Sequence, residues 1–158
     1  MHDLLIRNAA IALPDGELLE GDLACTEGRI TAIASQIGSD GREEIDAEGK
    51  LLMPGVIDPQ VHFREPGGTE KEDLASGSRA AVRGGVTSFL EMPNCNPPTI
   101  DQEQMDWKIS RGRTTSVANF GFFVGATVEN LEALNNVHPA CGIKIFMGSS
   151  TGSLLVNE

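Results

Sequence analysis

The stretch PGVIDPQVHFREPG, residues 54–67, decides how the chain is interpreted. It opens with an apolar run that is typical of a buried β-strand, and it ends in a polar turn that contains proline and glycine. Within it, Asp58, Gln60 and His62 are spaced two apart, and residues two apart on a strand point to the same side. The stretch therefore predicts a buried strand, running through to Phe63, that presents a row of polar groups at its carboxyl end.

After this stretch, apolar runs alternate with more polar segments of helical character. Strands are predicted at 56–63, 86–90, 116–123 and 142–147, and helices at 70–83, 101–112 and 128–136. Repeated β-α units with near-continuous apolar strands indicate parallel strands covered by helices. Four such units are half of a (β/α)8 barrel, which needs about 250 residues. The sequence thus predicts an α/β fold in which residues 54–158 form the first four units of an incomplete TIM-type barrel, with a small open α/β sheet as the alternative.

Residues 1–53 have a different pattern. Short apolar runs at 4–9, 21–25 and 29–33 are separated by turn sequences such as Pro14-Asp15-Gly16. No segment shows the apolar periodicity of a helix. This region is predicted to form a small antiparallel β unit.

Composition narrows the classes of function. The chain has 158 residues and a formal net charge of −11, which argues against nucleic acid and anionic membranes as partners because both need a basic surface. No basic leader precedes an apolar core, and no apolar run approaches the ~20 residues of a membrane span. The three cysteines, Cys25, Cys95 and Cys141, lack a C-x-x-C pair and are interpreted as reduced thiols. A cytoplasmic protein is expected.

Two motifs resemble those of dihydroorotases and their relatives, the allantoinases and dihydropyrimidinases, in the amidohydrolase superfamily. The first lies within residues 54–67, and the second is EMPNCNPP, residues 91–98. The small β unit resembles the N-terminal part of the composite β-sandwich domain of these enzymes, so the resemblance covers essentially the whole chain. It implies hydrolysis of a cyclic amide. The arginine of the first motif and the Met-Pro-Asn of the second favour a dihydroorotase, which interconverts dihydroorotate and N-carbamoyl-L-aspartate in pyrimidine biosynthesis.

The resemblance also implies a site for one or two zinc ions, and here the sequence departs from the family. The family has His-x-His on the first barrel strand; His62 matches the second histidine, but Gln60 stands at the first. His62 is predicted to bind metal. An amide oxygen is a weak zinc ligand beside imidazole, so Gln60 is predicted to bind weakly or to contact a ligand, with strand-end hydrogen bonding as the alternative. A single zinc ion, a weakly held second ion and loss of catalysis all stay open.

Two residues are predicted to bind the substrate carboxylate. The guanidinium of Arg64 suits a carboxylate because its planar fork donates two parallel hydrogen bonds. By resemblance, Asn94 is the second contact. The alternatives are a salt bridge from Arg64 to Glu65 or Glu72, and a simple turn position for Asn94.

Lys144 lies inside the apolar strand predicted at 142–147, where an unpaired ammonium is costly to bury. Burial favours the neutral amine, and by resemblance Lys144 matches a lysine that reacts with CO₂ to form a carbamate bridging two metals. The alternative is a lysine whose ammonium reaches solvent. The glycine- and serine-rich segment 148–153 is predicted to be a flexible active-site loop.

The resemblance places the general base and the remaining histidine ligands on later strands, beyond residue 158. No catalytic residue is therefore predicted within the chain, which we expect to be inactive alone. Dihydroorotate is the expected partner, with a homodimer or association with aspartate transcarbamoylase as further expectations. Two alternatives stay open: another hydrolase of this group (dihydropyrimidinase, hydantoinase or allantoinase), and a catalytically silent scaffold for aspartate transcarbamoylase, which Gln60 favours.

Overall fold

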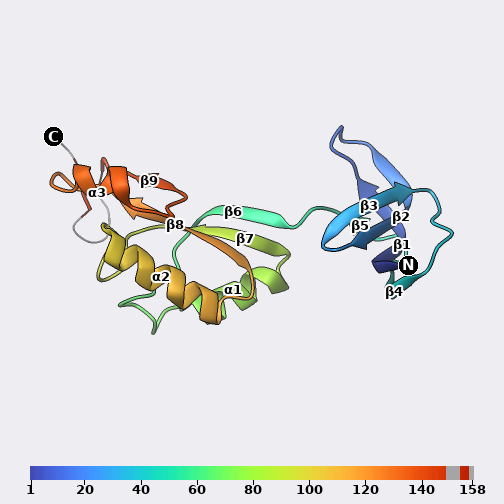
Figure 1. Ribbon diagram of the computed structural model, residues 1–158, viewed down its shortest axis with the longest axis horizontal. Coiled ribbons are helices and arrows are strands. Elements are labelled where there is room, and N and C mark those ends of the chain that lie inside the picture. The colour runs from blue at the N-terminus through green and yellow to red at the C-terminus, as the bar shows by residue number, and fades with distance from the viewer. Residues whose placement is uncertain (149–153, 157–158) are drawn as a thin grey trace. The chain divides into compact units, whose positions relative to one another are not determined.

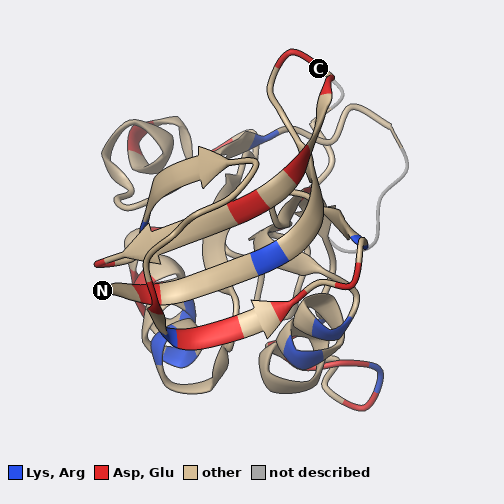
Figure 2. Ribbon diagram, turned by 90° about the vertical axis from the view of Figure 1, so that its right-hand side faces the viewer, with Lys and Arg blue, Asp and Glu red and all other residues tan. Residues whose placement is uncertain are grey.

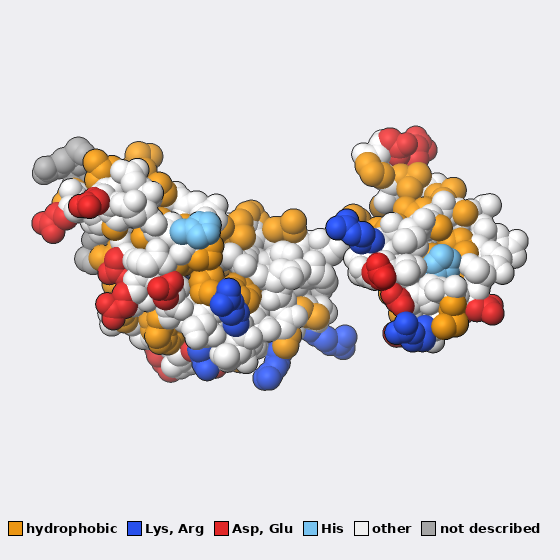
Figure 3. All heavy atoms as spheres, viewed as in Figure 1, with side chains coloured by type: hydrophobic (Ala, Val, Ile, Leu, Met, Phe, Trp, Pro, Cys, Tyr) orange, Lys and Arg blue, Asp and Glu red, His pale blue; other side chains and the backbone are white. Residues whose placement is uncertain are grey.

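The computed structural model describes residues 1–148 and 154–156 of the chain. It divides into two compact units, Met1–Pro54 and Gly55–Glu158 (Figure 1). Buried hydrophobic clusters form within each unit. Among the described residues the first unit has two such clusters and the second has one, so each unit has a core of its own. Exposed hydrophobic side chains also occur on both units (Figure 3).

The first unit is a sheet of five strands. These are β1 (His2–Ala12), β2 (Leu18–Thr26), β3 (Arg29–Ala34), β4 (Gly41–Asp46) and β5 (Leu51–Leu52), in the order β3-β2-β1-β4 with β5 also paired to β1. The pairs β1–β2 and β2–β3 are antiparallel, but β4 and β5 run parallel to β1. The prediction of an antiparallel unit was thus only partly right. The chain after β3 crosses to the far edge of the sheet and then follows β1 in the same direction, which the turn pattern alone does not reveal.

A buried carboxylate holds this crossing connection. Asp22 accepts hydrogen bonds from the backbone N–H of Ile37 at 3.0 Å and of Asn8 at 3.2 Å, and from the Arg7 guanidinium at 3.2 Å. Arg7 also donates to the Ile37 carbonyl and to Glu44. Figure 2 shows acidic and basic positions on neighbouring strands, and the sheet order β2-β1-β4 puts Arg7 between Asp22 and Glu44. The hydrogen bond from Ile37 is the main reason that the pKa of Asp22 lies below its usual value, because it stabilises the ionised form.

The second unit alternates strands and helices, as predicted. Its strands are β6 (Val56–Val61), β7 (Val86–Glu91), β8 (Asn119–Gly125) and β9 (Gly142–Lys144), and its helices are α1 (Leu74–Arg83), α2 (Gln102–Thr115) and α3 (Leu131–Asn136). The sheet has the order β6-β7-β8-β9 and is parallel throughout. Helix α1 contacts β7 and helix α2 contacts β8, which brings both helices against the sheet (Figure 1). The α/β class is confirmed.

Several element boundaries differ from the predictions for local reasons. Helix α1 begins at Leu74 instead of residue 70, because the Asp73 carboxylate accepts the Ser76 N–H and caps the helix. The last strand ends at Lys144, and Phe146 continues only as an isolated bridge to Leu155. The part of the predicted loop from 149 to 153 lies outside the described residues.

The core of the second unit lies on the helix side of its sheet. It consists of buried apolar side chains from the strands, from both long helices and from the segment after β6: Phe63, Leu74, Phe89, Met105, Phe122 and Val124. The rings of Phe63 and Phe89 meet edge to face with centroids 4.8 Å apart. Phe63 lies between two predicted site residues, His62 and Arg64, so this core fixes the backbone at the site.

The prediction that the whole strand 56–63 is buried was wrong. Val56 and Ile57 are 46% and 63% exposed, whereas Phe63 is buried. Helices α1 and α2 cover one face of the sheet, and within the described part of the chain no comparable layer covers these two side chains. No helix in that part of the chain is long and apolar enough to cross a membrane.

Candidate active site

The polar row on β6 is less regular than the sequence suggests. Asp58 pairs with Phe89 and Val61 pairs with Glu91, so three steps along β6 match two along β7. Pro59 lies in this interval and has no N–H for the ladder. The simple alternation that placed Asp58, Gln60 and His62 on one face therefore does not continue through the strand, because the bulge shifts the side-chain phase.

Gln60 is exposed, and its backbone N–H donates to the Asp58 carboxylate at 3.0 Å. This contact is made by the backbone N–H, so it does not show what the side-chain amide of Gln60 binds. The predicted weak metal contact of Gln60 stays a prediction.

His62 follows β6 and meets the loop after β7. Its Nδ1 lies 2.8 Å from the side-chain oxygen of Asn94. An amide oxygen only accepts hydrogen bonds, so Nδ1 carries the proton and donates. In the neutral ring this leaves the lone pair on Nε2, the arrangement that a metal-binding imidazole needs. This hydrogen bond joins the two strand-end motifs, as do those from the backbone N–H of Met92 to the Val61 carbonyl and of Asn96 to the Pro66 carbonyl.

The charge state of His62 fits the same role. Burial lowers the pKa of His62 below its usual value, and the nearby positive charges of Arg64, Lys144 and Lys108 lower it further. The hydrogen bond with Asn94 acts in the opposite direction. The neutral imidazole, which binds metal, is therefore favoured at neutral pH.

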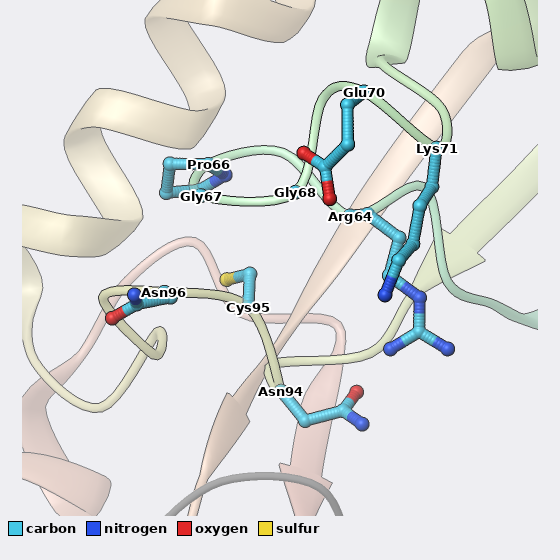
Figure 4. Close-up of a pocket in the computed structure, with 9 residues that line it drawn as sticks. All are labelled: Arg64, Pro66, Gly67, Gly68, Glu70, Lys71, Asn94, Cys95 and Asn96. Carbon is cyan, nitrogen blue, oxygen red and sulfur yellow. The ribbon is translucent and has the colours of Figure 1, made fainter.

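Arg64 and Asn94 line one pocket, as the substrate-binding prediction requires. The pocket has a volume of about 340 Å³ and is bordered by two loops: Arg64, Pro66, Gly67, Gly68, Glu70 and Lys71 after β6, and Asn94, Cys95 and Asn96 after β7. Figure 4 shows the Arg64 guanidinium and the Asn94 amide on the same side of these loops. The alternative salt bridges from Arg64 to Glu65 or Glu72 are absent among the described residues, where Glu65 pairs with Arg111.

Lys144 ends β9 and pairs in register with Gly125. It is half-buried, and its ammonium lies 5.1 Å from the centre of the Phe146 ring. Its charge acts on His62, so the residues predicted at this edge are brought within electrostatic reach of one another. Carboxylation of Lys144 stays a prediction.

These residues do not form a complete zinc site. No group of three His, Cys, Asp or Glu side chains suited to a metal occurs within residues 1–148 and 154–156. His62 contributes one imidazole, whereas a catalytic zinc ion normally has three protein ligands. A zinc ion here would therefore need further ligands from outside this set.

Two ion pairs beneath the site, of which only the first is buried on both sides, were not predicted. The Lys108 ammonium lies 2.7 Å from the Glu91 carboxylate, and both side chains are only 1% exposed. Glu91 also accepts a hydrogen bond from the backbone N–H of Phe63. Burial raises the pKa of Glu91, and Lys108 and the Phe63 N–H oppose that shift. The pair ties helix α2 to the backbone between His62 and Arg64.

The second pair holds the other side of the same segment. Glu65 is buried and accepts from Arg111 Nε at 2.6 Å and from the backbone N–H of Leu74 at 2.8 Å. Lys108 and Arg111 are three residues apart and lie on the same side of α2. The sequence did carry a signal: Lys108 lies between Met105 and Gly112 at helical spacing, so it falls on the buried face of the helix.

Comparison with known proteins assigns the family. The Dihydro-orotase-like family matches residues 49–144, more than half of the chain. The chain belongs to this family. It is 38% identical over its full length to a dihydroorotase of Methanosarcina acetivorans, of which it covers 34%. It is also 38% identical, over 90% of its length, to an allantoinase of Desulfitobacterium hafniense, of which it covers 31%. The chain thus spans about a third of the length of these relatives.

A solved structure supports the fold of this dihydroorotase-like chain. The L-hydantoinase (dihydropyrimidinase) of Arthrobacter aurescens superposes with a TM-score of 0.89 at 27% identity, over 99% of this chain and 35% of the other. The predicted first half of a barrel is confirmed. Within it, the strand-end residues can do two things: His62 presents a ring nitrogen, and Arg64 with Asn94 offers a polar pocket beside it.

Proposed function

We propose that the protein to which this dihydroorotase-like chain belongs hydrolyses a cyclic amide that carries a carboxylate, interconverting dihydroorotate and N-carbamoyl-L-aspartate. The observation that carries the proposal is the pocket shared by Arg64 and Asn94, next to His62. A guanidinium and an amide side by side suit a carboxylate. A cyclic amide without a carboxylate offers the Arg64 guanidinium no anionic partner.

The reaction defines the tasks of these side chains. Water adds to the ring carbonyl, the ring C–N bond breaks, the nitrogen takes a proton and a new carboxylate forms. Arg64 binds and orients the existing carboxylate, which holds the scissile amide in one place. Asn94 fixes the His62 ring, and the core around Phe63 fixes the backbone that carries both His62 and Arg64.

Zinc is part of this proposal. His62, together with Lys144 as its carbamate, would hold the ion, and the ion would polarise the ring carbonyl and acidify a bound water. Elemental analysis of the gene product at its natural length tests this point. Loss of stoichiometric zinc on His62→Ala, with replacement of the exposed His138 by alanine as the matched control, is the expected result.

The experiment on function compares Arg64→Met with Arg64→Lys in the protein at its natural length. Hydrolysis is measured on dihydroorotate and on three rings without this carboxylate: dihydrouracil, hydantoin and allantoin. We expect Arg64→Met to lower kcat/KM for dihydroorotate by about 100-fold, roughly the value of a charged bidentate contact, with Arg64→Lys between. Equal losses on all four rings would contradict the assignment.

The second candidate function is that of a catalytically inactive scaffold for aspartate transcarbamoylase, and Gln60 favours it. Gln60 stands where the family has a histidine, and an amide oxygen binds zinc weakly. A silent protein binds dihydroorotate without opening it and contains no zinc. Measurable hydrolysis together with bound zinc in the natural-length protein would exclude this candidate.

A further inference from the structure

A second cation lines the pocket beside Arg64. Lys71 lies in the turn before α1, where its backbone N–H donates to the Gly68 carbonyl at 3.0 Å. That turn places its side chain among the lining residues of the 340 Å³ pocket, together with Arg64 and Asn94. The pocket therefore has two positively charged side chains on one wall.

Neither cation forms an ion pair with a described residue of the chain. Across residues 1–148 and 154–156, the ion pairs involve other arginines and lysines, and none includes Arg64 or Lys71. This is notable in a chain with 23 acidic and 12 basic residues. Two like charges close together repel, so their proximity is unfavourable unless an anion lies between them.

The positions of the charged groups specify where an anion would bind. Figure 4 shows the charged ends of Arg64 and Lys71 pointing the same way, toward the side of the pocket where the Asn94 amide lies. The carboxylate of Glu70 lies away from that amide, beyond the two cations. The positive end of the pocket is thus next to Asn94, whose oxygen is bonded to His62.

We propose that Lys71 is a second cation for the substrate carboxylate and determines the preference of this site for anionic over neutral cyclic amides. The inference rests on the proposed function and extends it, because Arg64 alone was assigned to the carboxylate. Glu70, at the other end, repels an anion and limits its binding to the positive end.

The two cations have different tasks because their burial and shape differ. Arg64 is half-buried, and its planar fork fixes orientation. Lys71 is exposed on a flexible stem, so it attracts the anion without defining its angle. Lys71 therefore acts on KM and on the dissociation constant, with little effect on kcat. Its contribution is screened by salt.

The experiment measures equilibrium binding by calorimetry on the protein at its natural length. The ligands are dihydroorotate and dihydrouracil, which share the ring and differ in the carboxylate. We expect Lys71→Met to weaken dihydroorotate binding about fivefold at low salt and to leave dihydrouracil unchanged. Lys71→Arg restores binding, and about 1 M salt removes the difference.

Two further variants test the electrostatic origin. Lys50→Met is the matched control, since Lys50 is an exposed lysine of the first unit paired with Glu48; it should leave both ligands unchanged. Glu70→Gln should tighten dihydroorotate binding about twofold, the opposite sign to Lys71→Met. Equal effects of Lys71→Met on the two ligands, or no effect on either, would overturn the inference.

The outcomes separate this inference from the proposed function. Selective loss of dihydroorotate binding in Lys71→Met, in a protein that hydrolyses neither ring, supports the role of Lys71 and rejects the hydrolase. If Lys71→Met hydrolyses dihydroorotate with an unchanged KM, the proposed role of Lys71 is rejected and the proposed hydrolase function is retained. A wild-type protein that binds no dihydroorotate overturns both.

Discussion

Each unit of the chain holds a buried carboxylate against a cation, and folding shifts the pKa values of the two carboxylates in opposite directions. Asp22, in the first unit, accepts two backbone N–H groups as well as Arg7, and its pKa is lowered. Glu91, in the second unit, is enclosed with Lys108, and its pKa is raised. The difference shows that donors decide the ionisation of a buried acid as much as a counter-charge does. Backbone donors replace the water that Asp22 has lost, whereas Glu91 relies on Lys108 and one N–H.

The largest effect is expected from breaking the enclosed pair. Lys108→Met leaves the Glu91 carboxylate buried without a counter-charge and should lower the free energy of unfolding by about 3–5 kcal/mol. Trp107 is the only tryptophan, the chain has no tyrosine, and Trp107 lies on α2 next to Lys108. Its fluorescence during urea unfolding therefore reports the second unit.

The double variant tests whether the pair itself stabilises the fold. Lys108→Met combined with Glu91→Leu removes both charges and should recover most of the loss, although the Phe63 N–H then lacks its acceptor. Arg79→Met is the control, because Arg79 is an exposed cation on α1 of the same unit. It should cause no measurable change. A double variant as unstable as Lys108→Met would show that the cost comes from lost packing instead of the stranded charge.

A smaller effect with a distinct pH dependence is expected at Asp22. Asp22→Asn should cost about 2 kcal/mol at pH 7, because the amide presents a donor to groups that are themselves donors. The pKa of Asp22 is lowered by folding, so its ionised form stabilises the fold above the unfolded pKa of about 3.9, and this stability is lost as the pH falls through the folded pKa. The deficit should therefore shrink at pH 3.

The methyl signals of Leu5, in the core of the first unit, follow this change by NMR during urea unfolding. Glu48→Gln alters an exposed carboxylate of the same unit and should give no difference at either pH. A deficit for Asp22→Asn that is equal at pH 7 and pH 3 would show that ionisation of Asp22 does not stabilise the unit.

Some features of the fold could be predicted from the sequence, and others could not. The alternation of apolar strands and helices was visible because each strand is short, apolar and bounded by turn residues, and the motif around His62 marked the strand ends. The parallel pairing of β4 and β5 was not visible, because it depends on a crossing connection held by Asp22, a contact between residues distant in sequence. The bulge at Pro59 broke the alternation on which the polar row was predicted.

The site was predictable to the extent that its residues lie in motifs. His62, Arg64 and Asn94 come from two motifs on neighbouring strands, and parallel strands bring their carboxyl ends to one edge. Glu91 ends an apolar strand and Lys108 lies on the buried face of a helix, so each is a charged residue at a position where the sequence pattern predicts an apolar one. A charged residue at such a position indicates that a residue of opposite charge is buried beside it, but the sequence does not identify that residue. Lys71 has no local signal, because its place in the pocket depends on the turn before α1.

The smallest effect on stability is expected at the ion pair between Arg111 and Glu65. It allows a buried ion pair to be compared with one that solvent reaches. Arg111 is 40% exposed, and Glu65 keeps the Leu74 N–H when Arg111 is removed. Arg111→Met should therefore lower the free energy of unfolding by about 1 kcal/mol or less, measured again by Trp107 fluorescence. Because solvent reaches this pair, about 1 M salt should remove the deficit of Arg111→Met but leave that of Lys108→Met, which lies out of reach of ions. If salt removed both deficits equally, Lys108 and Glu91 would have to be accessible to water, and the buried support under His62 and Arg64 would be no more than a surface ion pair.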